Sequence, residues 1–327
     1  MMNSIFFFLA LNVVLVAQKQ NERLEIPRDT SFTLFSAAER IKNQYPEARL
    51  VLPELPKGVI VHNDLVYAQY GQRALHLDVL RPENKKSLPA VILIHGGGWR
   101  SGERSQGIAI AQRLAANGYV AATVEYRLSI EALYPAAVYD LKAAVRWMHA
   151  HAAEYSIDTT RIAVLGCSAG GQLAALLGTT NGDRRFEGSG GNAGHSNDVH
   201  AVVDIDGILD FTDPAESGKD TIPEKPSAGS YWFGGPLRDK RELWVEASPL
   251  VHVNAKTAPI IFINSSLERF HAGRDAMIEK LNALGIYSEV HTIPDTPHTF
   301  WFFHPWFERT CDFALAFLNK TLKNNEQ

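Results

Sequence analysis

Short apolar runs recur along the chain, and stretches that favour helix separate them. Several runs are apolar at every position, which is typical of strands covered on both faces in a parallel sheet. Strands that alternate with helices form βαβ units. The sequence therefore predicts an α/β fold with a mostly parallel central sheet flanked by helices. The predicted strands are residues 91–95, 120–125, 161–165, 202–205, 260–264 and 288–293.

Other segments predict how this alternation begins, ends and is interrupted. Short spacings within residues 59–81 indicate an antiparallel start to the sheet, with a helix over 32–43 before it and a closing helix over 307–323. Residues 182–197 are rich in Gly, Asn and Ser, whereas residues 211–246 carry prolines, charges and an aromatic cluster. Both segments are expected to be insertions over the functional site.

The first residues predict a leader. Residues 5–17 are almost wholly apolar, and a polar, charged run follows them. As a helix this segment would be ~20 Å long, which is too short for the ~30 Å hydrocarbon core of a membrane. We therefore expect residues 1–17 to be a signal peptide and the protein to be secreted or periplasmic, without a stable membrane anchor. The alternative is an uncleaved anchor. Residues 18–58 would form an N-terminal extension, and 59–323 one main domain with insertions.

A candidate nucleophile follows the predicted strand 161–165. The segment Gly166-Cys167-Ser168-Ala169-Gly170 places small residues two positions before and after a serine, and a helix-forming stretch comes next. Such residues permit the sharp strand-to-helix turn that projects a serine hydroxyl away from the sheet. We therefore predict that Ser168 is the nucleophile and that Cys167 is buried beneath the turn.

A glycine-rich segment upstream could stabilise a developing oxyanion. His95-Gly96-Gly97-Gly98-Trp99 follows the predicted strand 91–95. Glycines let backbone N–H groups approach a substrate oxygen without a side chain in the way. The predicted oxyanion donors are the N–H groups of Gly97 and Gly98, together with that of Ala169, each typically worth ~3 kcal/mol of barrier.

The general base is expected late in the chain, because folds with this kind of turn present serine, acid and histidine in that order. His298 lies in the turn cluster Pro294-Asp295-Thr296-Pro297-His298, directly after the predicted strand 288–293. His304 is the alternative, although it follows an aromatic run and could serve only packing. His298 is the predicted base.

The acid has two candidates. Glu268 follows the predicted strand 260–264 in an irregular loop, where a carboxylate could fix the tautomer of His298. Asp206 lies at the end of the preceding strand, near Asp204 and Asp210. Glu268 is ranked first and Asp206 second.

These motifs, with Glu125-Tyr126-Arg127-Leu128 and the Pro135-Ala136-Ala137 segment before Asp140, carry a family resemblance. Over residues 59–322 the chain resembles α/β-hydrolase esterases of the acetyl-xylan and feruloyl esterase-like group, which are related to hormone-sensitive-lipase-like carboxylesterases. The resemblance implies a serine ester hydrolase of the α/β-hydrolase fold. Such families usually read His-Gly-x-x-Asp after the penultimate strand, whereas this chain reads Asn264-Ser265-Ser266-Leu267-Glu268.

The resemblance also implies a substrate class. Stretches at 188–194 and 270–274 look like those of secreted bacterial carbohydrate esterases. This likeness implies that the substrate is an acylated plant polysaccharide or oligosaccharide, with acetyl as the first choice of acyl group. The alternatives are a general short-chain carboxylesterase, a feruloyl esterase, a serine peptidase or a binding protein without catalysis. Trp99 and Trp232 are the predicted substrate-contacting aromatic residues. Core packing is the alternative for both.

Composition narrows the partners. The formal net charge is −4 and the basic clusters are short, so nucleic acid is not an expected partner. The two cysteines, Cys167 and Cys311, do not make a disulfide framework. The sequence contains no His-Glu-x-x-His or paired-cysteine motif, and neither a metal nor another cofactor is expected. The oligomeric state is not predicted.

Overall fold

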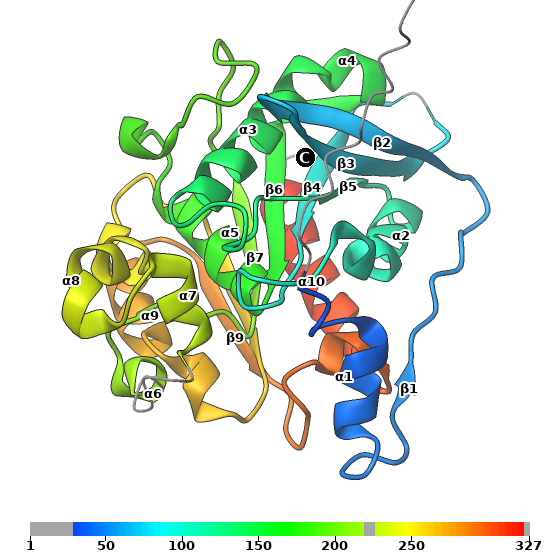
Figure 1. The fold of residues 1–327 in the computed structure, drawn as a ribbon. Helices are drawn as coiled ribbons and strands as arrows, with labels where there is room; N and C mark the ends of the chain where they lie inside the picture. Colours follow the sequence, from blue (N-terminus) through cyan, green and yellow to red (C-terminus); the bar gives the residue numbers. More distant parts are fainter. Residues whose placement is uncertain (1–28, 85, 219–225, 324–327) are drawn as a thin grey trace, which may run out of the picture.

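The structure, a computed structural model, describes residues 29–84, 86–218 and 226–323 (Figure 1). The predicted signal peptide lies outside these residues. Within the described part of the chain, no helix combines the length and apolar character needed to cross a membrane.

The described residues form a central sheet of eight strands in the order β2-β3-β5-β4-β6-β7-β8-β9. The strands β2 and β3 pair antiparallel, as do β3 and β5, and all later neighbours are parallel. The predicted α/β fold and its antiparallel start are thus confirmed. The strand bounds are β2 (Val59–Tyr70), β3 (Arg73–Pro82), β4 (Leu88–Ile94), β5 (Val120–Val124), β6 (Ile157–Cys167), β7 (Ala201–Ile205), β8 (Ile260–Asn264) and β9 (Ser288–Thr292).

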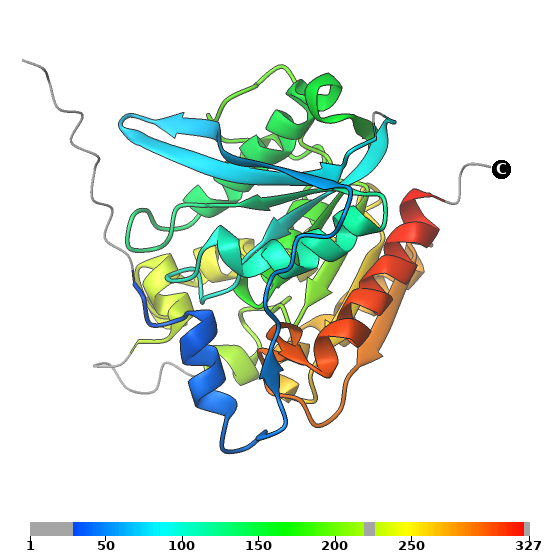
Figure 2. The same ribbon diagram turned by 90° about the vertical axis from the view of Figure 1, so that its right-hand side faces the viewer.

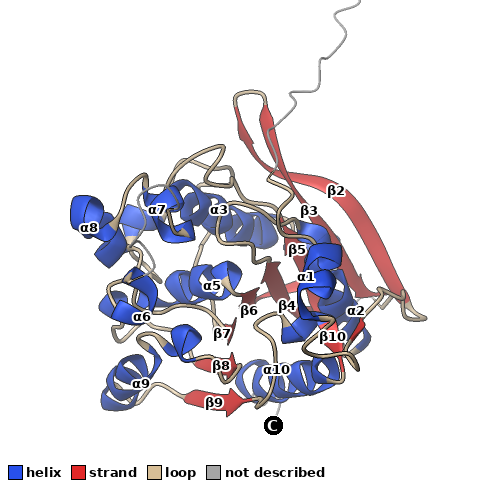
Figure 3. Cartoon of the chain, turned by 60° about the horizontal axis from the view of Figure 1, so that its bottom comes forward, coloured by secondary structure: helices blue, strands red, loops and turns tan. Residues whose placement is uncertain are grey.

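Helices cover both faces of this sheet (Figure 3). One apolar core contains side chains of α3, α5 and α9, and a second contains side chains of α1, α2 and α10. Successive residues of β4 alternate between the two cores, because side chains of a strand point to opposite faces. The main helices are α1 (Leu34–Ile41), α2 (Ile108–Ala116), α3 (Ala136–Ala150), α5 (Ala169–Thr179), α9 (Arg274–Ala283) and α10 (Trp306–Leu322).

Shorter elements lie in the connections. These are the helices α4 (Ala152–Tyr155), α6 (Pro214–Ser217), α7 (Ala228–Phe233) and α8 (Leu237–Glu246), and the 3₁₀ turns η1 (Arg104–Gly107), η2 (Arg184–Phe186), η3 (Pro249–His252), η4 (Glu268–His271) and η5 (Phe300–Phe302).

The N-terminal extension packs near the C-terminal part of the domain. The short strand β1 (Arg49–Leu50) pairs with β10 (Phe303–His304), so α1 and β1 lie at the same end of the molecule as the start of α10 (Figure 2). Ala37 and Ile41 of α1 belong to the same core as the three aromatic residues of η5. The extension is therefore built into the fold.

Residues 182–197 do not cover the site, contrary to expectation. Arg146 on α3 donates hydrogen bonds to the carbonyl oxygens of Glu187, Gly190 and Gly191, which hold this loop against α3. None of these loop residues lines the cavity above Ser168. The other insertion, 211–246, does contribute to that cavity.

Candidate active site

Ser168 occupies a strained turn between β6 and α5. Its backbone has φ 57° and ψ −120°, a conformation that L side chains rarely adopt and that persists only where the surroundings enforce it. A Cβ atom at Gly166 would lie 1.9 Å from the Gly170 carbonyl oxygen, and one at Gly170 would lie 2.1 Å from the Ile94 carbonyl oxygen. Only glycine fits at either position, which explains the small residues on both sides of the serine.

His298 joins Ser168 to a buried carboxylate. Its Nε2 lies 2.8 Å from Ser168 Oγ, and its Nδ1 lies 2.9 Å from Asp206 Oδ2. A proton on Nδ1 that is donated to Asp206 leaves Nε2 as the acceptor for the Ser168 hydroxyl. This is the arrangement of a serine, histidine and aspartate triad, in the chain order serine, acid, histidine.

The structure places Asp206, not Glu268, beside His298. The ranking of Glu268 above Asp206 as the acid is therefore wrong. Asp206 follows β7 and is fully buried, and its Oδ1 accepts a hydrogen bond from Ser265 N–H at 2.7 Å and one from Asn264 Nδ2 at 3.4 Å. The residues after β8 therefore supply donors to the acid rather than the acid itself. Glu268 comes after the chain has turned outward and is exposed.

Aromatic rings fix the plane of the His298 imidazole. The Phe270 ring stacks on it at a centroid distance of 3.6 Å, and the Trp301 ring meets it edge to face at 5.2 Å. His304, the alternative base, instead pairs with Glu308 through Nδ1 at 2.6 Å. The structure thus brings His298 to Ser168 and leaves His304 in contact with Glu308 instead.

The glycine loop lies against the serine turn. A Cβ atom at Gly96 would lie 3.2 Å from Ser168 Cβ, so the two loops approach closely at a glycine. The Gly97 carbonyl accepts hydrogen bonds from Ser101 N–H at 3.0 Å and Ser101 Oγ at 2.9 Å. Because C=O and N–H point in opposite directions in a trans peptide, the Gly98 N–H points away from Ser101. Gly97, Gly98 and Ala169 all line the cavity that contains Ser168.

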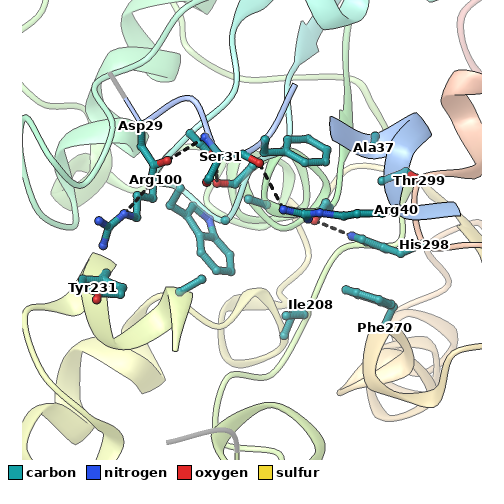
Figure 4. A pocket seen from close by; sticks show the side chains of 18 of the residues that line it. Asp29, Ser31, Ala37, Arg40, Arg100, Ile208, Tyr231, Phe270, His298 and Thr299 are labelled. Atoms are coloured by element: carbon teal, nitrogen blue, oxygen red, sulfur yellow. Dashed lines mark hydrogen bonds and ion pairs between the residues drawn. The ribbon is translucent and has the colours of Figure 1, made fainter. Parts of the chain in front are cut away.

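The cavity above Ser168 has a volume of about 560 Å³ (Figure 4). The N-terminal extension supplies one wall and the insertion 211–246 another, whereas η4 and the loop after β9 supply the side with His298. The sequence reasoning missed the wall from the extension, because no local pattern shows where a segment outside the sheet packs. Arg100, Arg269 and Phe270 were also not predicted to line the cavity, and within the aromatic cluster 231–233 the sequence pointed to Trp232 rather than to Tyr231.

The two tryptophans predicted to contact substrate occupy different positions. Trp99 lines the cavity, although only 2% of its surface is exposed, and its Nε1 donates to Gln172 Oε1 at 2.9 Å. Trp232 has no exposed surface, does not line the cavity and stacks on Trp99 at 4.9 Å. Trp232 therefore does not lie where a residue predicted to contact substrate would have to be. Its neighbour Tyr231 is the aromatic residue that the insertion presents to the cavity.

Burial controls the ionisation of two groups next to the triad. Burial, followed by the charges of nearby acidic groups, raises the pKa of the Cys167 thiol well above its usual range, so this cysteine is not a thiolate. Burial also raises the pKa of Asp204 to about 7, an effect opposed by a hydrogen bond from Gly207 N–H and reinforced by the charge of Asp206. Both cysteines are free and buried. Among the described residues, no group of His, Cys, Asp or Glu side chains is arranged to hold a metal ion.

Much of the chain matches one protein-family model. The BD-FAE family model matches residues 77–272, a range that includes the glycine loop, Ser168 and Asp206. The chain belongs to the BD-FAE family. His298 lies beyond the matched range and reaches the site through the loop after β9.

Curated relatives of this BD-FAE chain are named as esterases. Esterase LipC of Mycobacterium tuberculosis (strain ATCC 25618 / H37Rv) is 33% identical over 232 residues, which cover 68% of this chain and 54% of that protein. Esterase LipQ of the same strain is 26% identical over 220 residues, covering 66% of this chain and 49% of LipQ. The chain spans about half the length of these relatives.

Solved structures share the fold. A bifunctional GH43-CE protein of Bacteroides eggerthii is 26% identical with a TM-score of 0.70, over 80% of this chain and 38% of that one. A truncated carbohydrate esterase from gut microbiota is 24% identical with a TM-score of 0.68, over 82% of this chain and all of that one (100%). The α/β-hydrolase fold is therefore confirmed for this BD-FAE member.

Proposed function

We propose that the protein is a secreted serine carboxylic ester hydrolase that removes acetyl groups from plant cell-wall polysaccharides or oligosaccharides. The observation that carries the proposal is the continuous contact from Ser168 Oγ through His298 to Asp206, at 2.8 and 2.9 Å, on the floor of a large cavity. Secretion rests on the predicted leader alone.

In the first half of the reaction Ser168 Oγ attacks the ester carbonyl carbon while His298 Nε2 takes the serine proton. Asp206 holds the imidazole in the required tautomer and stabilises the imidazolium. The Gly98 and Ala169 N–H groups, with Gly97 beside them, stabilise the oxyanion. Ala169 begins the helix α5, so the helix dipole adds to this stabilisation. His298 then protonates the leaving alcohol, and an acyl-enzyme remains.

In the second half, His298 removes a proton from water as the water attacks the acyl-enzyme. The second tetrahedral intermediate collapses, Ser168 recovers its proton and the carboxylic acid leaves. Fixed donors and a fixed base cost no reorganisation during the reaction, which is the source of their effect on rate.

Two findings support a carbohydrate substrate. The cavity of about 560 Å³ has room for a sugar beside an acetyl group. The Bacteroides eggerthii protein, which is named a GH43-CE, is similar over 80% of this chain. A general short-chain carboxylesterase is the second candidate, because LipC, named simply an esterase, is 33% identical.

The test compares initial rates on p-nitrophenyl acetate, butyrate and octanoate with acetate release from acetylated xylan and pectin. We expect Ser168→Ala to lower turnover by ~10⁴-fold or more on every substrate. Acetate release from a polysaccharide that disappears in Ser168→Ala would support the proposal. Preference for longer acyl chains without polysaccharide activity would favour the general carboxylesterase. Near-normal rates in Ser168→Ala would overturn both.

A further inference from the structure

The cavity lining carries positive charge in a chain of negative net charge. Its charged residues, apart from His298, are Arg40, Arg100, Arg269 and Asp29, whereas the whole chain has a formal net charge of −4. Asp206 lies behind His298 and does not line the cavity. The excess of arginine is therefore local to the place where substrate would bind.

Two of these arginines are already paired. Arg100 Nε lies 2.6 Å from Asp29 Oδ2, and its guanidinium lies 3.9 Å from the centre of the Tyr231 ring. Arg269 binds the fully buried Glu216 through Nε at 2.6 Å and Nη2 at 3.2 Å. Both guanidinium groups are thus largely neutralised and held in place.

Arg40 differs from them. Its Nη2 donates to the Ser31 carbonyl oxygen at 3.2 Å, and among the residues that the structure describes no carboxylate pairs with it. The adjacent Glu39 is bound to Lys42 Nζ at 2.5 Å. Arg40 is exposed, and its remaining donors are available to an anion in the cavity.

The position of Arg40 relates it to one part of the substrate. Its helix, α1, shares a core with η5, which begins two residues after His298. In Figure 4 the Arg40 side chain lies on the His298 side of the cavity, and Arg100 and Tyr231 lie on the other side. Because His298 protonates the leaving alcohol in the proposed reaction, the alcohol part of the ester lies on the same side as Arg40.

We propose that Arg40 binds a carboxylate on the alcohol part of the ester. The substrate class would then be an acetylated acidic saccharide, one that contains a uronic acid. A guanidinium group matches a carboxylate with two parallel N–H···O bonds, which gives orientation as well as affinity. This inference rests on the proposed ester hydrolase activity and adds the charge of the substrate to it.

The experiment measures kcat/KM for two acetate esters of similar shape, the anionic 4-acetoxybenzoate and the neutral 4-acetoxybenzamide, in wild type and variants. We expect Arg40→Gln to lower the anionic-to-neutral ratio of kcat/KM about tenfold, the usual loss for one charge-assisted contact. Arg40→Lys should give an intermediate ratio, because lysine keeps the positive charge but lacks the two parallel N–H donors of the guanidinium group. Lys42→Gln is the matched control, since it removes one positive charge at the C-cap of the same helix, outside the cavity lining.

The outcomes separate the two proposals. If wild type hydrolyses neither ester, the ester hydrolase proposal fails. If it hydrolyses both and Arg40→Gln leaves the ratio unchanged, the carboxylate site is wrong and the hydrolase stands. An equal fall of the ratio in Lys42→Gln would show a general field effect and would also overturn the site.

A binding measurement gives a readout independent of turnover. Calorimetric titration of Ser168→Ala with glucuronate and with glucose should show tighter binding of glucuronate. The preference should disappear when Arg40→Gln is added. Equal affinity for the two sugars in Ser168→Ala would contradict the carboxylate site.

Discussion

At the scale of single residues, Asp204 and Asp206 lie two positions apart and are both fully buried, yet their carboxylates have different hydrogen-bond partners. Asp206 is buried, and its carboxylate has hydrogen-bond partners in Ser265, Asn264 and His298. Asp204 is equally buried, receives one hydrogen bond from Gly207 N–H, and its Oδ2 has no hydrogen-bond partner in the described part of the chain. Burial accordingly raises the pKa of Asp204 to about 7.

This shift predicts a pH dependence of stability. Between pH 4 and pH 7 folded Asp204 keeps a proton that the unfolded chain has released, so the free energy of unfolding falls as pH rises through this window and levels off above it. The amide in Asp204→Asn does not ionise, so the free energy of unfolding of this variant does not fall in this way. Relative to wild type, we expect the variant to gain about 2–3 kcal/mol between pH 5 and pH 8, at 1.36 kcal/mol per pH unit.

Urea denaturation at the two pH values measures the difference. Asp312→Asn is the control, because it removes one carboxylate from an exposed position instead of a buried one. A stability difference between Asp204→Asn and wild type that is the same at pH 5 and pH 8 would show that Asp204 is ionised throughout.

At the scale of elements, α7 joins the insertion 211–246 to Trp99 at the end of the glycine loop. Trp232 of α7 stacks on Trp99 and meets the ring of Tyr134 edge to face, whereas its neighbour Tyr231 is 42% exposed and faces the cavity. One helix thus anchors the insertion with one ring and presents another to the cavity.

These two positions predict contrasting effects. Trp232→Ala should lower the free energy of unfolding by about 3–5 kcal/mol, the usual loss for a large buried ring. Tyr231→Ala should cost about 1 kcal/mol or less, since it removes one exposed contact with Arg100. Its effect should instead appear in KM for acetylated oligosaccharides. Thermal and urea denaturation with steady-state kinetics measure both, and a reversed order of stability loss would contradict the assignment of the two rings.

The elements also show what sequence alone can predict. Strands such as β8 and β4 were predictable because an unbroken apolar run of this length between polar turns is typical of a buried strand. The elbow around Ser168 and the glycine loop were predictable because backbone geometry leaves only glycine possible at Gly166 and Gly97. Such local requirements fix the residue type, so they can be recognised from the sequence alone.

Properties that depend on tertiary distance were not predictable in the same way. Glu268 and Asp206 both follow buried strands, and only the folded structure shows that Asp206 lies 2.9 Å from His298 Nδ1. Trp232 and Tyr231 are adjacent in sequence, and only packing separates core from cavity. The position of α1 beside the cavity depends on contacts with η5, more than 250 residues later, and no local pattern encodes them.

At the scale of the whole molecule, the carboxyl ends of parallel strands gather the site. Ser168 follows β6, Asp206 follows β7, and His298 follows β9, while the glycine loop follows β4. Because these ends share one edge of the sheet, residues up to 130 positions apart in sequence come within hydrogen-bond distance. We propose that this edge activates Ser168 through His298 and Asp206.

The most direct test is the rate at which a fluorophosphonate modifies the protein, followed by mass spectrometry of the labelled peptide. We predict one adduct, on Ser168, that forms ~10³-fold or more slowly in Asp206→Asn. We also predict an unchanged rate in Glu268→Gln, in which the exposed carboxylate is removed. An adduct on another residue, or a rate that falls in Glu268→Gln and not in Asp206→Asn, would contradict this activation of Ser168.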